Sequence, residues 1–337
     1  ISPEGRDRAY KQAAPHRFER RFDKRVNPKS SVVPIKPKSM APIFPEDLKE
    51  VKFVLKQLFI QGKSIYDKRA LKPLYTSYLK KQLTLKNIYE IAQRITNKYR
   101  NDGYLLSKAI VPPQKIKDGV VHLRIIEGYI DKIKIQGPVR GPRKLINKYK
   151  KNILKSRPLR AHDLERYLLL IDDLPGVTAK SILTPSEDKP SATTMTLILA
   201  DKAFVGHIGA DNRGSKFNGP YQFLGGVTVN SLLGDHSRAG LQGVFTSQTE
   251  ELLFLNAFYD LPINQEGTRL FFSSSVSESE PGSTLKQFDI NGDSTSITLR
   301  LTHPFLRSRG KNLTGHLGFT GRNSTTKILG SLDSEDR

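Results

Sequence analysis

Two short stretches of this 337-residue chain hold side chains whose types and spacing could support catalysis. Ser77 and Lys80 have the Ser-x-x-Lys spacing of one hydrolase class, and Asp172 and Asp173 form a carboxylate pair suited to acid–base chemistry. The first pair has no companion motif, and "LLLIDDLPGV" is typical of a helix end. Histidines at seven positions show no paired ligand spacing: His16, His122, His162, His207, His236, His303 and His316. The sequence therefore indicates no enzyme, no metal site and no cofactor.

The charge is unevenly distributed along the chain. Residues 1–200 hold 42 Lys and Arg against 19 Asp and Glu, whereas residues 201–337 hold 13 against 14. A basic first half could attract nucleic acid, anionic lipid headgroups or an acidic protein. No aromatic side chains are interleaved with the basic ones and no reading motif is present, so nucleic acid is not an expected partner. Cysteine is absent, which excludes disulfide and thiol chemistry.

The N-terminal segment divides near Val26. Residues 1–26 could form a charged helix interrupted at Pro15, and residues 27–48 carry closely spaced prolines typical of an extended tether. A disordered tail fits the same composition.

The middle of the chain repeats one order of elements. "VKFVLKQLFIQG" predicts a strand, two helical segments follow, and "YLLSKAIV" and "GVVHLRII" predict two further strands. In the second helical segment, apolar residues at spacings of three and four predict one buried face: Leu85, Ile88, Ala92, Ile95 and Tyr99. The same order returns from "YIDKIKIQG" to "ATTMTLILA". A repeat of this length predicts two tandem α+β modules, at residues 49–128 and 129–201.

The joint between these modules is very short. Only Glu127 and Gly128 separate the last predicted strand of the first module from the first strand of the second. A connection this short predicts a hinge of restricted angle, which would make the two modules a semi-rigid arm.

Residues 202–337 change to strands of about ten residues with period-two alternation. Seven such strands fit between Phe204 and Arg322, each with one apolar and one polar face. A soluble β-sandwich and a membrane β-barrel both produce this alternation. Polar residues and glycines gathered on one face, with aromatic residues near strand ends, favour the barrel.

Several motifs together resemble one family, the outer-membrane transporters of two-partner secretion, of the haemolysin-activator or ShlB type. The most specific is "YLLSKAIVPPQKIKDGVVHLRIIEGYIDKIKIQG"; others are "NSLLGDHSRAG", "YDLP" and "LTHPFLRSRGKNL". "GADNRGSKFNG" resembles the family's first barrel strand and its loop, with Asp211, Asn212, Gly214 and Ser215 as the motif residues.

The resemblance implies a fold of two polypeptide-transport-associated (POTRA) modules, each of order β-α-α-β-β, followed by antiparallel transmembrane barrel strands. Residues 1–26 would be a plug helix, residues 27–48 a linker, and residues 202–337 the N-terminal part of a sixteen-stranded barrel. About seven strands are present and the family's Val-Arg-Gly-Tyr-type loop is missing, so we expect a partial chain with an incomplete barrel.

The resemblance also implies a function. The chain would belong to a translocation pore in the outer membrane of a Gram-negative bacterium, with its POTRA modules in the periplasm. Its partners would be outer-membrane lipid and a secreted protein, haemolysin-like or adhesin-like, held as unfolded polypeptide, and the transporter would be a monomer. An outer-membrane assembly factor and a soluble binding protein with a β-sandwich are the alternatives.

POTRA edge strands suggest where the client docks, because an edge exposes unpaired N–H and C=O groups. By analogy the docking edges are Tyr104 to Val111, including Leu106, Lys108 and Ile110, and Val177 to Leu183, including Ala179 and Ser181. Four helical residues would line adjoining grooves or fill the module cores: Ile88, Ile95, Leu164 and Leu168.

Overall fold

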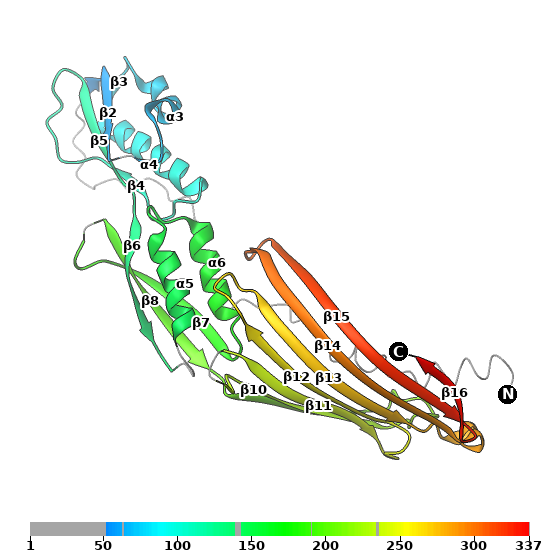
Figure 1. Ribbon diagram of the computed structural model, residues 1–337. Coiled ribbons are helices and arrows are strands. Elements are labelled where there is room, and N and C mark those ends of the chain that lie inside the picture. The colour runs from blue at the N-terminus through cyan, green and yellow to red at the C-terminus, as the bar shows by residue number, and fades with distance from the viewer. Residues whose placement is uncertain (1–51, 63, 139–142, 190, 234–235, 337) are drawn as a thin grey trace.

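The computed structural model of the protein describes residues 52–62, 64–138, 143–189, 191–233 and 236–336. Figure 1 shows three parts in chain order, namely two small modules followed by a long antiparallel sheet. The expected plug helix at residues 1–26 and the expected linker at residues 27–48 lie outside the described residues.

The first module packs one long helix on a three-stranded sheet. The sheet has the order β2 (Gln57–Gln61), β5 (Val120–Ile126), β4 (Lys108–Ile110), with β5 parallel to β2 and antiparallel to β4. α4 (Leu85–Asn101) begins with a capping box formed by Thr84 and Asn87, which satisfies N–H groups of the first turn. Four residues of the predicted apolar face are buried in the core of this module, namely Ile88, Ala92, Ile95 and Tyr99, and Leu85 is half-buried.

The first predicted helix of this module is mostly irregular. It contains the short α3 (Lys68–Leu71) and two 3-10 turns, at Lys72–Leu74 and Thr76–Tyr78. Pro73 cannot donate a backbone hydrogen bond, which limits regular helix beyond α3. The strand predicted from "VKFVLKQLFIQG" is divided into β1 (Phe53–Val54) and β2, and β1 pairs with β3 (Gln82–Leu83), which was not predicted.

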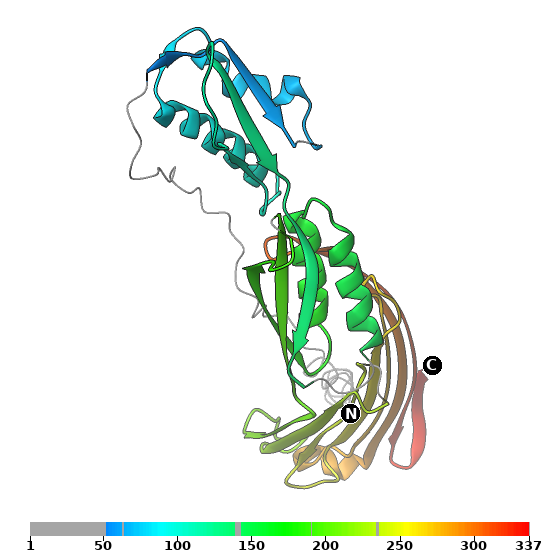
Figure 2. The same cartoon turned by 90° about the vertical axis from the view of Figure 1, so that its left-hand side faces the viewer.

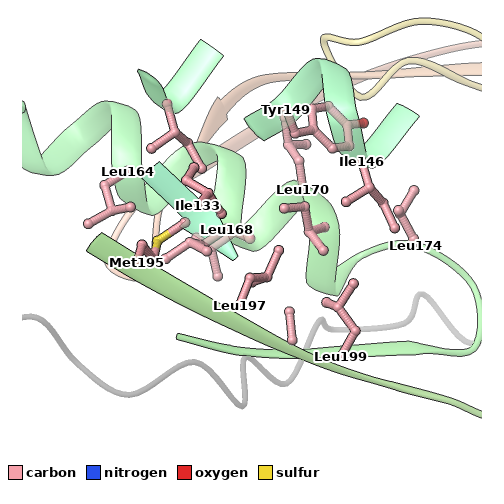
Figure 3. Packing of buried hydrophobic residues seen from close by; sticks show 14 of the residues in the cluster. Ile133, Ile146, Tyr149, Leu164, Leu168, Leu170, Leu174, Met195, Leu197 and Leu199 are labelled. Carbon is pink, nitrogen blue, oxygen red and sulfur yellow. The ribbon is translucent and has the colours of Figure 1, made fainter. Parts of the chain in front are cut away.

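The second module has the same strand order with longer strands. Its sheet has the order β6 (Tyr129–Gln136), β8 (Ala192–Asp201), β7 (Val177–Pro185), and it packs against α5 (Lys144–Lys155) and α6 (Ala161–Asp172). Figure 3 shows the core, where Ile146 and Tyr149 of α5 and Leu168 of α6 meet Met195 and Leu197 of β8. The predicted repeat therefore corresponds to two sheets with the same strand order.

The rest of the chain forms one eight-stranded antiparallel sheet in which each strand pairs with its neighbours in sequence. The strands are β9 (Phe204–Asp211), β10 (Gln222–Asn230), β11 (Arg238–Thr246), β12 (Leu253–Pro262), β13 (Arg269–Ser279), β14 (Ile290–Arg307), β15 (Asn312–Ile328) and β16 (Ser331–Asp336). β16 lies beyond the seven strands predicted up to Arg322. The sheet is curved and not closed, and β9 and β16 are its edges (Figure 2). Within the described residues no second sheet packs on it, so the sandwich interpretation is wrong.

The two faces of the large sheet differ in polarity. Ile208, Leu317 and Phe319 point outward and leave 94%, 75% and 72% of their surface exposed. The inner face carries hydroxyl side chains, and Ser275 on β13 bonds Ser296 on β14 at 2.8 Å between their Oγ atoms. An apolar outer face and a polar inner face are the arrangement of a barrel wall in a membrane. Separately, no helix among the described residues is long and apolar enough to cross a membrane.

Candidate functional site

Each module sheet has one antiparallel strand at an edge, β4 in the first module and β7 in the second. The two edges differ in length, because β4 has three residues and β7 has nine. An incoming extended chain gains main-chain hydrogen bonds in proportion to the open edge it meets.

The predicted docking segment Tyr104 to Val111 is not one continuous strand. Tyr104 is buried with its ring edge-on to Tyr66 and Tyr99, and Leu106 packs against the core of the second module. Only Lys108 to Ile110 form β4, in which Lys108 is exposed and Ile110 half-buried. The N–H of Ala109 donates to Thr96 Oγ1 at 2.9 Å. This edge has few free main-chain groups for an incoming chain, because β4 is short and the Ala109 N–H already donates to a side chain.

β7 offers a longer edge, and only part of it is open. Val177 and Ala179 are buried; the Val177 N–H donates to the Leu174 carbonyl, and the Ala179 N–H to Asp172 Oδ1 at 2.9 Å. Since bonding direction alternates along a strand, the N–H groups of Ser181 and Leu183 point the same way, away from β8. Among the described residues, no acceptor is recorded on that side for these two N–H groups. The open edge is therefore Ser181 to Leu183.

The expected groove residues do not reach the surface. Ile88, Ile95 and Leu164 are 0% exposed and Leu168 is 1% exposed, because all four lie on helix faces packed against the module sheets. A side chain without exposed surface cannot contact a bound polypeptide. These residues fill the cores, and the groove interpretation is corrected accordingly.

Glu127 at the joint binds three residues of the first module. Its carboxylate accepts hydrogen bonds from the Ser64 N–H at 2.7 Å, the Ser64 hydroxyl, the Ile65 N–H at 3.0 Å and the Tyr99 hydroxyl at 2.9 Å. Partial burial opposes ionisation of this carboxyl, but these hydrogen bonds outweigh it and lower the pKa of Glu127. Burial, together with the bond to Glu127, raises the pKa of Tyr99.

The joint is also braced from the second module. The Leu159 N–H donates to the Gly128 carbonyl at 3.0 Å, and the Ala161 N–H at the start of α6 donates to the Gly103 carbonyl at 2.8 Å. Gly128 has no room for a side chain, since an added Cβ would lie 2.4 Å from the Leu106 carbonyl oxygen. Leu106 also packs against the core of the second module, so contacts from both modules hold the joint.

α6 carries the contacts between the second module and the large sheet, which sequence reasoning missed. Arg307 at the end of β14 donates to both carboxylate oxygens of Asp173, at 2.6 and 2.7 Å. Arg166 donates to the Pro304 carbonyl at 3.3 Å, and Glu165 accepts from the Arg309 N–H at 2.9 Å. The only sequence signal was "LTHPFLRSRGKNL", which supplies Arg307 and Arg309 without indicating their partners.

The loop after β9 is a compact turn built from the predicted motif. Asp211 accepts from the Arg213 N–H at 3.0 Å, and Ser215 Oγ accepts from the Asn218 N–H at 3.1 Å. An added Cβ on Gly214 would lie 1.8 Å from the Gly219 carbonyl oxygen, so the turn requires glycine there. Asn212 lies between these contacts, in the same loop.

Arginines and phenylalanines line the inner face of the large sheet near the modules. Asp260 on β12 is 4% exposed and pairs with Arg238 on β11 at 2.9 Å and Arg269 on β13 at 3.0 Å. Arg300 on β14 stacks over the Phe271 ring at 4.6 Å. These contacts join four neighbouring strands. In the part of the chain that the structure describes, no group of three or more potential metal ligands is found.

Two family models match parts of the chain. A ShlB-type POTRA domain matches residues 53–128, and the haemolysin secretion/activation protein ShlB/FhaC/HecB matches residues 199–336. Together they cover more than half of the chain and include both the first module and the large sheet.

Curated relatives agree with these matches. The heme/hemopexin transporter protein HuxB of Haemophilus influenzae (strain 86-028NP) is 27% identical over 281 residues, which is 82% of this chain and 49% of HuxB. The outer membrane transporter CdiB of Dickeya dadantii (strain 3937) is 25% identical over 183 residues, 54% of this chain and 32% of CdiB. The chain thus spans about half the length of the HuxB relatives it matches.

Two solved structures share the fold. CdiB from Escherichia coli superposes with a TM-score of 0.63 at 19% identity, covering 98% of this chain and 66% of CdiB. CdiB from Acinetobacter baumannii gives 0.55 at 14% identity, covering 97% and 63%. The expected fold class of POTRA modules followed by an incomplete barrel is confirmed. The chain therefore contains a ShlB-type POTRA domain and a domain of the ShlB/FhaC/HecB haemolysin secretion/activation proteins.

Proposed function

We propose that this chain is part of an outer-membrane translocation pore of a two-partner secretion system. The large sheet contributes barrel wall in the outer membrane of a Gram-negative bacterium, and the two modules lie in the periplasm. The transported partner is an unfolded polypeptide of a haemolysin-like or adhesin-like protein, and the transporter works as a monomer surrounded by outer-membrane lipid. The match of the large sheet to a haemolysin secretion model favours this function over assembly of other barrel proteins.

One observation carries the proposal: β7 has an open edge at Ser181 to Leu183 in the module that contacts the barrel wall. Main-chain pairing at an edge makes little demand on the sequence of the incoming chain. That suits a carrier of unfolded polypeptide. The half-buried Ser181 and the partly packed Leu183 would contribute N–H and C=O groups rather than side chains.

Substitution of Ser181 by proline tests this directly. Proline removes the outward N–H while leaving the pairing of its neighbours with β8 intact, as edge strands tolerate. Loss of one such hydrogen bond is worth about 1 kcal/mol, roughly fivefold in client affinity. Ser181→Ala is the matched control because it keeps the N–H. We expect Ser181→Pro to lower client binding and secretion several-fold relative to Ser181→Ala, and equal values in a folded protein would contradict the proposal.

A further inference from the structure

The two adjacent carboxylates at the end of α6, Asp172 and Asp173, bind different elements. Asp172 Oδ1 accepts the Ala179 N–H of β7 at 2.9 Å, whereas Asp173 binds Arg307 of β14 through both carboxylate oxygens. The two aspartates are adjacent in sequence, so the end of one helix contacts both β7 and β14.

The pair between Asp173 and Arg307 is shielded from water on the arginine side. The Arg307 side chain is 6% exposed and the Asp173 side chain 27% exposed. A two-point arginine–carboxylate contact fixes the relative orientation of its partners as well as their distance. Arg307 Nη1 also donates to Asn312 Oδ1 at 3.2 Å, which holds the guanidinium from the barrel side.

Further contacts along α6 restrict sliding of the helix on the sheet. Arg166, 12% exposed, donates to the carbonyls of Pro304 on β14 and Glu266 in the β12–β13 turn at 3.3 Å, so one side chain bridges a strand and a turn of the large sheet. Leu170 also lies so close to Gly267 that an added Cβ there would be 2.5 Å from it.

We propose that Asp173 and Arg307 are positioning residues that hold the open edge of β7 at a fixed place beside the barrel wall. Asp172 contributes to this placement, because it hydrogen-bonds the start of β7 to the same helix end at which Asp173 binds the barrel wall. The inference deepens the proposed function, since it says why a client captured on β7 is presented at the pore. The placement itself can be measured without any client.

The test is a distance measurement in a membrane-inserted transporter that carries this chain. This chain contains no cysteine, so spin labels can be attached to cysteines introduced at Ile182 on β7 and Lys327 on β15. We expect a narrow distance distribution in the parent. In Asp173→Ala and in Arg307→Ala its width should at least double. Asp188→Asn, which removes an exposed carboxyl from the β7–β8 turn, should leave it unchanged.

A charge swap separates positioning from general destabilisation. Asp173→Arg combined with Arg307→Asp restores an ion pair, and a cation at a helix C-terminus is favoured by the helix dipole. We expect the double variant to recover the narrow distribution. Unchanged width in both folded single variants, or no recovery in a folded double variant, would overturn the inference.

Secretion measured in the same variants distinguishes this inference from the proposed function. Broadening accompanied by a several-fold loss of secretion supports both. Broadening with full secretion supports the positioning role and contradicts the use of β7 as the docking edge.

Discussion

At the scale of single residues, Glu127 shows how one carboxylate can stabilise a joint between modules. It follows β5 directly and accepts hydrogen bonds from Ser64 and Ile65, which follow β2, and from Tyr99 on α4. Hydrogen bonds to an ionised group are stronger than those between neutral groups. The carboxylate therefore fixes the residue from which the chain enters the second module.

Glu127→Gln should destabilise the first module in a pH-dependent way. A glutamine cannot satisfy all these donors, and we expect a loss of about 1–3 kcal/mol at pH 7. Because the pKa of Glu127 is lowered on folding, its contribution is complete above the unfolded value of about 4.3 and is lost as pH falls through the folded pKa. Parent and variant should therefore converge in acid.

Urea unfolding of residues 46–201 at a series of pH values measures this effect. Glu187→Gln, which changes an exposed carboxyl in the second module, should match the parent throughout. A difference between Glu127→Gln and the parent that stays constant down to about pH 3 would contradict the assigned role.

At the scale of elements, α4 and α6 each bury one face, and this determines what their apolar residues can do. Ile95 and Leu168 are fully enclosed by the module cores. Ile95→Ala and Leu168→Ala should therefore cost about 2–5 kcal/mol of unfolding free energy. In variants that remain folded, client affinity should not change.

Urea unfolding and client titration of the same two variants separate stability from binding. Near-parental stability with weakened client binding would indicate that these side chains line a binding groove, and would contradict their assignment to the cores.

The elements were predictable to the extent that local patterns determine them. The spacing of Leu85, Ile88 and Ile95 predicted α4, and the repeat predicted two modules of the same order, because periodicity reflects burial against a sheet. β3 and the division of the first predicted strand into β1 and β2 were missed, because two-residue strands carry no period. The satisfied N–H of Ala109 was also not predictable, since it depends on Thr96 in a different element.

At the scale of the whole molecule, the large sheet was predictable and its connection to the arm was not. Alternation of apolar and polar residues indicated a barrel wall, and a single curved sheet with an apolar outer face is present. The contact between Asp173 and Arg307 joins residues 134 positions apart, and nothing in the sequence pairs them. Asp173 was interpreted only as part of a helix end, although that helix end is where the second module contacts the large sheet.

The sheet and the two modules thus form a continuous structure. Hydrogen bonds link the first module to α6 at Ala161, and ion pairs and hydrogen bonds link α6 to β14. A client strand added to β7 would therefore lie at a defined place relative to the barrel wall.

The most direct test is site-specific photo-crosslinking to a client stalled during secretion through a transporter that carries this chain. A photoreactive residue replaces either the exposed Ile182 on β7 or the exposed Lys108 on β4. We predict that the stalled client crosslinks strongly from position 182 and weakly or not at all from position 108. Crosslinking from position 108 alone, or from neither position while secretion proceeds, would contradict the account.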